Sequence, residues 1–580
     1  MKIRTWIAGY FLAMLLCGIN SYLTLKVGVI EEGVCITALL YAGTLILMRV
    51  KISSEELALV ATMGSAGGAF GFIANFYAAF YLIGQPMTFW QMVIFSLLTS
   101  MLGLVTNIPL RQLYIVEESL PWPGSQAAIA TMNILGGNEG KKQTIILFVF
   151  TALSFIYVFG SQILELAKMP ALTYFGFLGL SASTIGLGIA WSPFIIGVGL
   201  WIGTRVGIGF LVAAILLTLF APIIAQVDPG KPPHQFIWPG VMFMVTYGLT
   251  DLLMQWKTTI RAFQSVFSTR KSDRFNKKLD EVMSAKQFYI LTAAVMLALT
   301  IFMYYSFNVP VHLTIIMAIF GAGIFNLIAT RASAETAFNP IRIMSVMLQG
   351  VCAMFGGAPT AVNLSGAGFA SGSIGQSSVL TSDNFFGRHF GVSAKQQWWL
   401  QLLVLIPITL VSVFVFMKIS TIYVVGGDTL SSPIAKMWAS MARMFGGELG
   451  SLPKMAIESM WIGGIAGILL SFGNAWVNKS LADAEGIKKL ILGLTPHPFG
   501  IGIGLILPIY YSIAFFFGAI LLCEIIPRLF KTDENTLYSV ASAGLVGEGI
   551  ASLIGAIMVA SGLVKPILEF FTLHLPWMIK

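Results

Sequence analysis

The chain has 580 residues, of which 57% are apolar and only 10% are charged, and its formal net charge is +9. A soluble domain carries about 25% charged residues. This composition and the mean hydropathy of +0.85 therefore exclude a soluble, fibrous, disordered or nucleic-acid-binding protein as a whole. The apolar runs are continuous and do not alternate with a period of two, which also excludes an outer-membrane barrel. The sequence indicates a polytopic membrane protein.

Apolar runs of membrane-spanning length follow one another along nearly the whole chain. A spanning helix needs about 20 predominantly apolar residues. In chain order the runs lie near 5–30, 33–49, 56–84, 88–108, 143–168, 172–190, 194–226, 237–256, 287–307, 311–330, 341–358, 360–380, 396–418, 455–475, 487–528, 536–562 and 562–578. The run 487–528 could be one span or a broken pair. We predict an all-α polytopic membrane protein with about 16 transmembrane helices in two bundles of about eight, including broken or re-entrant helices.

The basic segment 257–286 separates the two groups of runs. It holds eight of the 34 lysines and arginines, and the positive-inside rule puts such a segment in the cytoplasm. The spans before it return the chain to the side of Lys2 and Arg4, so the amino end is expected to be cytoplasmic, with the first run a span and not a signal peptide. We expect an amino-terminal bundle (1–256), a cytoplasmic loop (257–286) and a carboxy-terminal bundle (287–580) in the plasma membrane.

Stretches rich in glycine and serine interrupt several runs, at 64–68, 365–373 and 500–504. Two structures account for such stretches. Small residues allow close helix packing, whereas broken helices expose free amide and carbonyl ends to a cavity within the membrane. Packing is favoured for three glycines spaced four residues apart, Gly199, Gly203 and Gly207.

The segment 359–384 favours a cavity lining. Gly, Ser, Thr and Asn fill about half of its positions, and so many polar groups should not face lipid. Asn363, Ser365 and Ser373 are therefore candidate substrate-binding residues.

Motifs for catalysis and metal binding are nearly absent. The phosphate-loop pattern is missed near 136–143, and no His-Glu-x-x-His is present. The histidines are scattered singly: His234, His312, His389, His497 and His574. The cysteines lie in apolar runs without metal or redox spacing and are expected to be buried: Cys17, Cys35, Cys352 and Cys523. We therefore expect no catalytic residue, no metal site and no cofactor, with a proton as the coupling ion.

Ionisable residues within a bilayer are costly and usually face an interior or a partner. Glu548 lies near the middle of the run 536–562. A carboxyl group removed from water favours its protonated form, so Glu548 could carry a proton, or it could form a structural hydrogen bond between helices. Lys26 and Arg205 could pair with an acid or bind a substrate carboxylate, although Lys26 could equally snorkel to the interface. Asp383 is a further candidate for binding the proton or a substrate amine.

The segment 109–125 reads Pro-Leu-Arg-Gln-Leu-Tyr-Ile-Val-Glu-Glu-Ser-Leu-Pro-Trp-Pro-Gly-Ser and directly follows a span. Its prolines should stop the preceding helix, and a new helix can begin at Ser125. Arg111, Glu117 and Glu118 could form a cytoplasmic gate or only a solvated loop pair.

Five segments together resemble the oligopeptide transporter (OPT) family, in its prokaryotic branch, which is related to the yellow-stripe-like metal-chelate transporters. The segment 109–125 is similar to the family's Pro-Leu-Arg…Val-Glu-Glu-x-Leu-Pro-x-Pro pattern and is the most specific match. The others are residues 20–28, similar to Tyr-x-Gly-Leu-Lys-x-Gly; 388–397, similar to Gly-x-x-x-Arg-Lys-Gln-Gln; 498–508, similar to Gly-Ile-Gly-x-x-x-Pro; and 543–549, similar to Gly-Leu-Ile-Ala-Gly-Glu. Two positions depart from the family: residues 382–387 lack its usual lysine, and Thr24 stands where it usually has glycine.

The resemblance implies about 16 spans in two halves and secondary active uptake, generally with protons. Family substrates range from oligopeptides and glutathione to metals bound by siderophores or nicotianamine. Our hypothesis is a proton-coupled symporter for a small peptide or peptide-like metal chelate, working by alternating access. Half-helix amino ends and a cation would bind the carboxylate of such a substrate. The alternatives are a passive channel for a small polar solute and a membrane-embedded enzyme. The expected partners are the lipid bilayer and the substrate, and the oligomeric state is left open.

Overall fold

The computed structural model describes residues 2–27, 33–136, 141–163, 176–177, 180–181, 187–227, 236–254, 276–336, 339–356, 359–427, 430, 432–446, 455–482, 485–532 and 534–560. The chain forms two compact units, each made of segments that are separate in sequence. Unit 1 comprises Met1–Gly136, Lys257–Ala334 and Asn339–Ser451, and unit 2 comprises Gly137–Trp256, Glu335–Phe338 and Leu452–Lys580. Each unit takes residues from both sides of the segment 257–286, so the units differ from the expected halves 1–256 and 287–580. Helices distant in sequence, such as α1 (Ile3–Val27) and α18 (Ala394–Ile422), pack together within unit 1.

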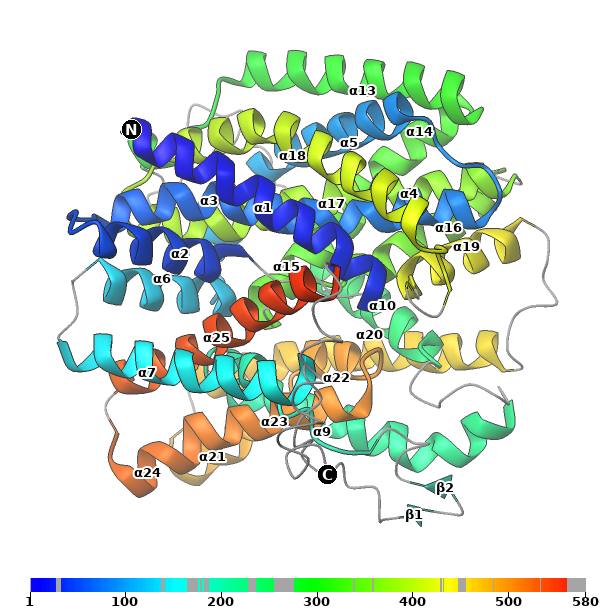
Figure 1. The fold of residues 1–580 in the computed structure, drawn as a ribbon. Coiled ribbons are helices and arrows are strands. Elements are labelled where there is room, and N and C mark those ends of the chain that lie inside the picture. The colour runs from blue at the N-terminus through cyan, green and yellow to red at the C-terminus, as the bar shows by residue number, and fades with distance from the viewer. Residues whose placement is uncertain are drawn as a thin grey trace, which may run out of the picture. The chain divides into compact units, whose positions relative to one another are not determined.

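Unit 1 is built from helices throughout its described part (Figure 1). They are α1 (Ile3–Val27), α2 (Gly33–Leu47), α3 (Ser54–Phe70), α4 (Ala74–Leu82), α5 (Phe89–Arg111), α6 (Pro123–Leu135), α12 (Lys277–Asp280), α13 (Ala285–Phe307), α14 (Val311–Met317), α15 (Asn326–Thr336, in this unit to residue 334), α16 (Ile341–Met354), α17 (Thr360–His389), α18 (Ala394–Ile422) and α19 (Pro433–Phe445). A short 3-10 turn, η1 (Gly71–Ile73), and two π-helical turns, η2 (Gln112–Glu117) and η5 (Ala318–Phe325), join some of them.

Unit 2 is also mainly helical. Its elements are α7 (Lys141–Val158), η3 (Phe159–Ile163), α9 (Pro193–Val227), α10 (Trp238–Met254), α20 (Ala456–Ala482), α21 (Gly486–Gly493), α22 (Pro498–Gly504), α23 (Ile509–Ile520), η7 (Leu521–Ile525), α24 (Ile526–Phe530) and α25 (Glu534–Ala560). Two strands of two residues each, β1 (Gly176–Phe177) and β2 (Leu180–Ser181), pair antiparallel. They lie within the run 172–190, whose other described residues (187–190) are not helical, so the prediction of a spanning helix there is wrong in its described part. The run 562–578 lies outside the described residues.

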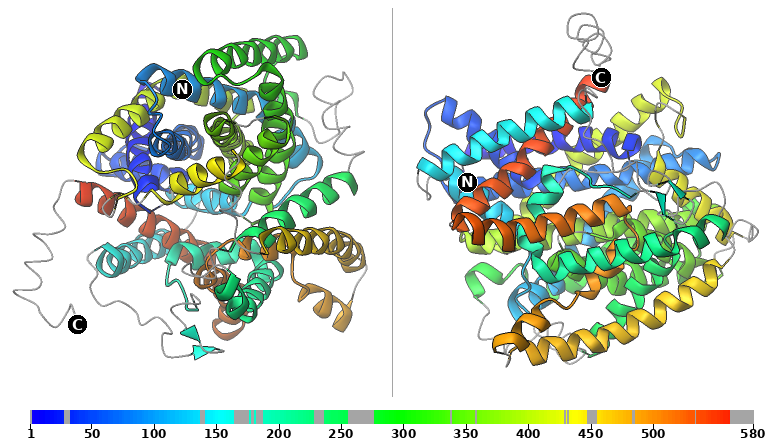
Figure 2. Two further views of the ribbon diagram at one scale, coloured as in Figure 1. Left: turned by 90° about the vertical axis from the view of Figure 1, so that its right-hand side faces the viewer. Right: turned by 90° about the horizontal axis from the view of Figure 1, so that it is seen from below.

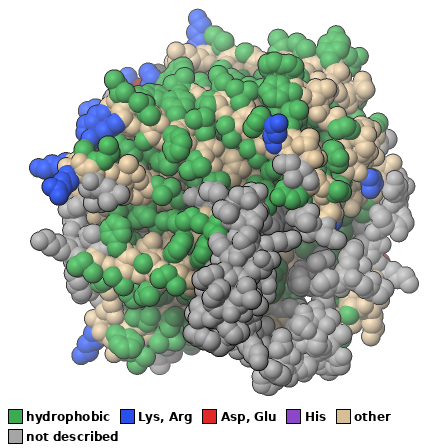
Figure 3. Space-filling model, viewed as in Figure 1, with side chains coloured by type: hydrophobic (Ala, Val, Ile, Leu, Met, Phe, Trp, Pro, Cys, Tyr) green, Lys and Arg blue, Asp and Glu red, His purple; other side chains and the backbone are tan. Residues whose placement is uncertain are grey.

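The predicted class of an all-α polytopic membrane protein is confirmed. Nine helices among the described residues are long and apolar enough to cross a membrane, and several shorter apolar helices accompany them. Hydrophobic side chains cover much of the described surface in Figure 3, with lysine and arginine side chains mainly toward its edges. Large apolar side chains on such a surface are expected where lipid and not water is the solvent. One helix that the hydropathy of the sequence did not indicate, α19, is short and amphipathic and buries Trp438.

The polar helix α17 forms the centre of unit 1. It packs against α3, α5, α16, α18 and α19, and the left view of Figure 2 shows helices of unit 1 around it. The helix runs unbroken through 365–373, and α3 runs unbroken through 64–68, so of the two structures considered for these stretches, the broken helix is not the one found. Their glycines provide close packing instead, since a Cβ at Gly67 would collide with the carbonyl oxygen of Ala13 and one at Gly372 with the hydroxyl of Thr99.

Two helix breaks lie within apolar runs in the described part of unit 2. Gly203 interrupts α9 with φ +76°, a backbone conformation open mainly to glycine. Gly199 and Gly207 pack tightly against α23, as predicted, whereas Gly203 has open space around it and is not a packing residue. The second break follows α22, which ends at Gly504 before Pro508 starts the next turn. The run 487–528 is therefore broken, one of the two structures that its length allowed.

Candidate functional site

Asp383 lies at the centre of a buried polar network in unit 1. Its side chain belongs to α17 and is fully buried. Its Oδ2 accepts hydrogen bonds from the Ser65 hydroxyl of α3 at 2.5 Å and from the Gln401 amide of α18 at 2.7 Å. Both of these partners are neutral. A carboxyl group in such surroundings depends on neighbouring donors for its stabilisation, because water is excluded.

Side-chain amides extend this network between α3, α17 and α18. The Gln397 amide donates to the Asp383 backbone carbonyl at 2.8 Å and to the Thr62 hydroxyl at 2.9 Å. Asn384 donates to the Gln397 carbonyl oxygen, and Gln376 to that of Gln401. Gln397 closes the segment 388–397 that carries the family resemblance, so that motif contributes a buried hydrogen-bonding group.

The other candidates on α17 divide into two kinds. The hydroxyls of Ser365 and Ser373 donate to the carbonyl oxygens of Val362 and Phe369 in their own helix. Asn363 is fully buried, and neither its amide nitrogen nor its carbonyl oxygen has a hydrogen-bond partner among the described residues. An unsatisfied buried polar group costs about 1–3 kcal/mol, so a water molecule or a ligand would be stabilised at Asn363.

Glu548 is held at the amino end of α9 in unit 2. The hydroxyl of Ser192, the residue before this helix, lies 2.8 Å from both carboxylate oxygens, and the backbone amide of Phe194 donates to Oε2 at 2.8 Å. The Ser192 hydroxyl oxygen in turn accepts from the Ile195 amide at 3.1 Å. The free amides and the dipole of a helix amino end favour a negative charge there. Of the two roles considered for Glu548, a proton carrier or a structural hydrogen bond between helices, these contacts match the second.

Arg205 follows the break at Gly203 and contacts neutral oxygen atoms. Its guanidinium donates to Asn478 Oδ1 at 2.8 Å, to Asn474 Oδ1 at 2.9 Å and to the Thr495 carbonyl at 3.2 Å. No carboxylate forms an ion pair with it in the described part of the chain. Three of its five N–H groups donate to described residues, which leaves two that could bind an anionic oxygen.

The pair of His497 and Glu335 was not predicted from the sequence. His497 Nε2 lies 3.3 Å from Glu335 Oε2, and its Nδ1 accepts from the Phe499 amide at the start of α22. The His497 backbone amide donates to the Arg205 carbonyl, so this pair and Arg205 lie at the same break. The available signal was the histidine directly before the proline and glycine segment 498–508.

The predicted gate residues have partners other than one another. Arg111 is buried and pairs with Asp280, and it also donates to the Asp280 carbonyl. Asp280 also pairs with Arg388 at 3.3 Å and accepts a hydrogen bond from its guanidinium at 3.4 Å. Glu118 pairs with Arg331 at 2.6 Å, with both side chains largely buried. These contacts are incompatible with a merely solvated pair, but they do not join Arg111 to Glu117 or Glu118.

The backbone around these residues is irregular. The π-helical turn η2 includes Glu117, whose Oε1 accepts from Gln112. Trp122 has φ +50° and donates its backbone amide to Ala334. The next helix, α6, begins at Pro123, near the predicted restart. Turns of this kind often occur at functional sites.

Two remaining predictions concern Lys26 and metal binding. The Lys26 side chain lies outside the described part of the chain. No group of three or more histidine, cysteine or acidic residues that could hold a metal ion occurs among the described residues. The cysteines of α1, α2 and α16 are buried, and Cys523 is partly buried.

The fold and these sites define a class of protein: a helical membrane protein with acids, amides and an arginine inside its helical units. The family model described as "OPT oligopeptide transporter protein" matches residues 1–559. The chain belongs to the OPT oligopeptide transporter family, as the five sequence segments indicated. This is a family of transporters, which sets aside the alternative of a membrane-embedded enzyme.

A relative from Saccharomyces cerevisiae, named "Putative oligopeptide transporter YGL114W", is 25% identical over 258 residues. The matched segment covers 43% of this chain and 34% of the yeast protein. The chain thus matches about a third of the length of that relative.

Proposed function

We propose that the protein is a secondary active transporter that moves a small peptide or peptide-like metal chelate together with protons, by alternating access. The observation that carries this proposal is the buried carboxyl group of Asp383, whose hydrogen-bond network can accept either of its protonation states. We further propose that the protein lies in the plasma membrane, with its amino end and the segment 257–286 in the cytoplasm. We also propose that it belongs to the prokaryotic branch of the family, which is related to the yellow-stripe-like transporters.

Ser65 allows Asp383 to gain and lose a proton without loss of hydrogen bonds. The Ser65 hydroxyl has one hydrogen but two acceptors within reach, Asp383 Oδ2 at 2.5 Å and the Thr62 carbonyl at 3.0 Å. When Asp383 is ionised, Ser65 donates to it. When Oδ2 carries the proton, Asp383 donates to Ser65, and the Ser65 hydrogen turns to Thr62. The Gln401 amide donates to Oδ2 in both states.

We propose two substrate-binding residues, each considered within its own unit: Arg205 in unit 2 and Asn363 in unit 1. A peptide or chelate offers carboxylate and amide groups. Arg205 keeps two N–H groups for a carboxylate, and its position beside the Gly203 break resembles the broken helices at which membrane transporters bind their substrates. Asn363 offers both an amide donor and a carbonyl acceptor to a peptide bond. We assign Glu548 the structural role of holding the amino end of α9.

The test is uptake into proteoliposomes that contain the purified protein and an imposed pH gradient. Pools of labelled dipeptides and tripeptides, glutathione and metal chelates serve as substrates. Symport predicts accumulation above the outside concentration and its collapse when a protonophore is added. Equilibration without accumulation, unaffected by the protonophore, would favour the passive channel instead.

A further inference from the structure

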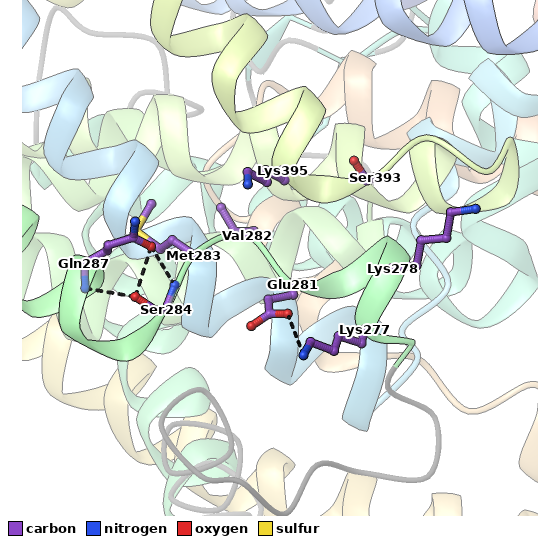
Figure 4. A pocket seen from close by; sticks show the side chains of 9 residues that line it. All are labelled: Lys277, Lys278, Glu281, Val282, Met283, Ser284, Gln287, Ser393 and Lys395. Carbon is purple, nitrogen blue, oxygen red and sulfur yellow. Dashed lines mark hydrogen bonds and ion pairs between the residues drawn. The ribbon is translucent and has the colours of Figure 1, made fainter.

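A basic pocket lies in unit 1 at the amino ends of α13 and α18 (Figure 4). Its volume is about 410 Å³, which lies within the ordinary range for small-molecule sites. The residues that line it are Lys277, Lys278, Glu281, Val282, Met283, Ser284, Gln287, Ser393 and Lys395. It lies apart from Asp383, which is fully buried and does not contribute to its lining.

The lining of the pocket carries an excess of positive charge. Three lysines and one acid line the pocket, and the acid, Glu281, lies 3.9 Å from the Lys277 ammonium group. Lys278 and Lys395 are exposed and form no ion pair among the described residues. A concave site with this charge attracts an anion, because two of its three lysines have no carboxylate partner among the described residues.

Two long helices begin at the pocket and add to this potential. Ser284 caps α13 and Ser393 caps α18, each in a capping box with the glutamine three residues later. These contacts satisfy some amides of the first turn, and the aligned peptide dipoles leave positive potential at both helix amino ends. The lysines and the two helices therefore favour the same kind of ligand.

The same two helices expose apolar faces directly beyond the pocket. Tyr289 and Ile290 of α13 and Trp399 and Leu403 of α18 are each more than 40% exposed. Tyrosine and tryptophan are enriched where a membrane meets water. A ligand with a negative headgroup in the pocket and hydrocarbon chains beside these faces would match both parts of the surface.

We propose that this pocket binds the phosphate headgroup of an anionic phospholipid from the surrounding bilayer. The lysines and helix amino ends hold the phosphate, and the acyl chains lie along the exposed faces of α13 and α18. Basic pockets at the cytoplasmic side of transmembrane helices commonly bind anionic lipids, and the proposed orientation puts this pocket on that side. Because Lys277 and Lys278 belong to α12, a headgroup bound to them also stabilises this short helix, which carries Asp280.

The test measures lipid binding to the full-length protein in neutral detergent by native mass spectrometry. Phosphatidylglycerol is compared with phosphatidylcholine of the same acyl chains and with soluble glycerol phosphate. The double variant Lys278→Gln/Lys395→Gln is compared with a control of equal charge change, Lys418→Gln/Lys436→Gln, whose lysines are exposed and lie outside the pocket. Circular dichroism confirms that both variants are folded.

We expect wild type and control to prefer phosphatidylglycerol to phosphatidylcholine. The pocket variant should bind phosphatidylglycerol about 30-fold more weakly than wild type, because it lacks the attraction of two lysines to the anionic headgroup. Equal binding of the two lipids by wild type, or equal loss in both variants, would overturn the proposal. Binding of glycerol phosphate as tight as that of the lipid would show a simple anion site and would overturn the assignment to a lipid.

Discussion

Asp383 and Glu548 are both acids within membrane helices, but different groups hold them. Asp383 accepts from the hydroxyl of Ser65 and the amide of Gln401, which are side chains that can reorient. Glu548 accepts from Ser192 and from the backbone amide of Phe194, which is fixed at the amino end of α9. Side chains that can reorient accommodate both protonation states of a carboxyl group. A fixed backbone N–H can only donate, so it always favours a carboxyl oxygen that accepts.

This difference separates a proton site from a structural site, although the sequence suggested Glu548 at least as strongly as Asp383. The distinction comes from the neighbours of each acid and not from its depth in an apolar run. Substitutions of the two acids and of Ser65 and Ser192 test this distinction.

Neutralisation of Asp383 should have the largest effect. Asp383→Asn removes the proposed proton site but keeps the size of the side chain, so we expect accumulation driven by a pH gradient to be lost. Exchange of labelled for unlabelled substrate at equal concentrations should persist, because exchange needs no net proton movement. Both are measured in proteoliposomes. Accumulation at the wild-type level would contradict the assignment of Asp383.

Arg205→Gln should weaken the binding of substrates that have a free carboxylate. A hydrogen bond to a charged group contributes about 1.5–3 kcal/mol, which corresponds to roughly a 10- to 150-fold rise in Kd. Peptides with an amidated carboxyl end provide the matched control. They should bind wild type and variant alike in calorimetry. An equal loss for free and amidated peptides would instead indicate a structural role for Arg205.

Ser65→Ala should change the pH dependence of uptake more than its maximal rate. The variant removes the hydroxyl that can both donate to Asp383 and accept from it, so one protonation state loses its partner at a cost of about 1–3 kcal/mol. Uptake measured between pH 5 and pH 8 should show a displaced optimum. Thr409→Ala is the control, because that buried hydroxyl donates only to Leu405 of its own helix and its loss should leave the optimum in place.

Glu548→Gln should have the smallest effect on transport. It weakens the contacts at the amino end of α9, and we expect a loss of about 1 kcal/mol in stability with an unchanged pH optimum. Thermal unfolding in detergent measures the stability, and uptake into proteoliposomes measures the pH optimum. Ser192→Ala should reproduce the loss of stability, since it removes the same contact. An altered pH optimum in Glu548→Gln would assign coupling to this acid.

The sequence predicted the helical class and the family because these depend on local signals. Runs such as 88–108 and 396–418 correspond to α5 and α18 within a few residues. Glycine was ambiguous because its role depends on its neighbours. Gly199 and Gly207 pack against α23, while Gly203, between them in the same spacing, breaks α9.

The candidate site was predictable by residue type but not by partner. Asp383, Arg205 and Glu548 were identified because charged residues are costly in apolar runs. Their contacts come from distant parts of the chain: Ser65 is 318 residues from Asp383, and Ser192 is 356 residues from Glu548. One sequence without related sequences contains no local signal for such pairs.

The most direct test of proton coupling through Asp383 is substrate-induced acidification inside proteoliposomes, followed with a trapped pH-sensitive dye. We predict that substrate added outside acidifies the lumen of vesicles containing wild type or Glu548→Gln, and leaves the pH of Asp383→Asn vesicles unchanged. Acidification by Asp383→Asn together with its loss in Glu548→Gln would contradict the account.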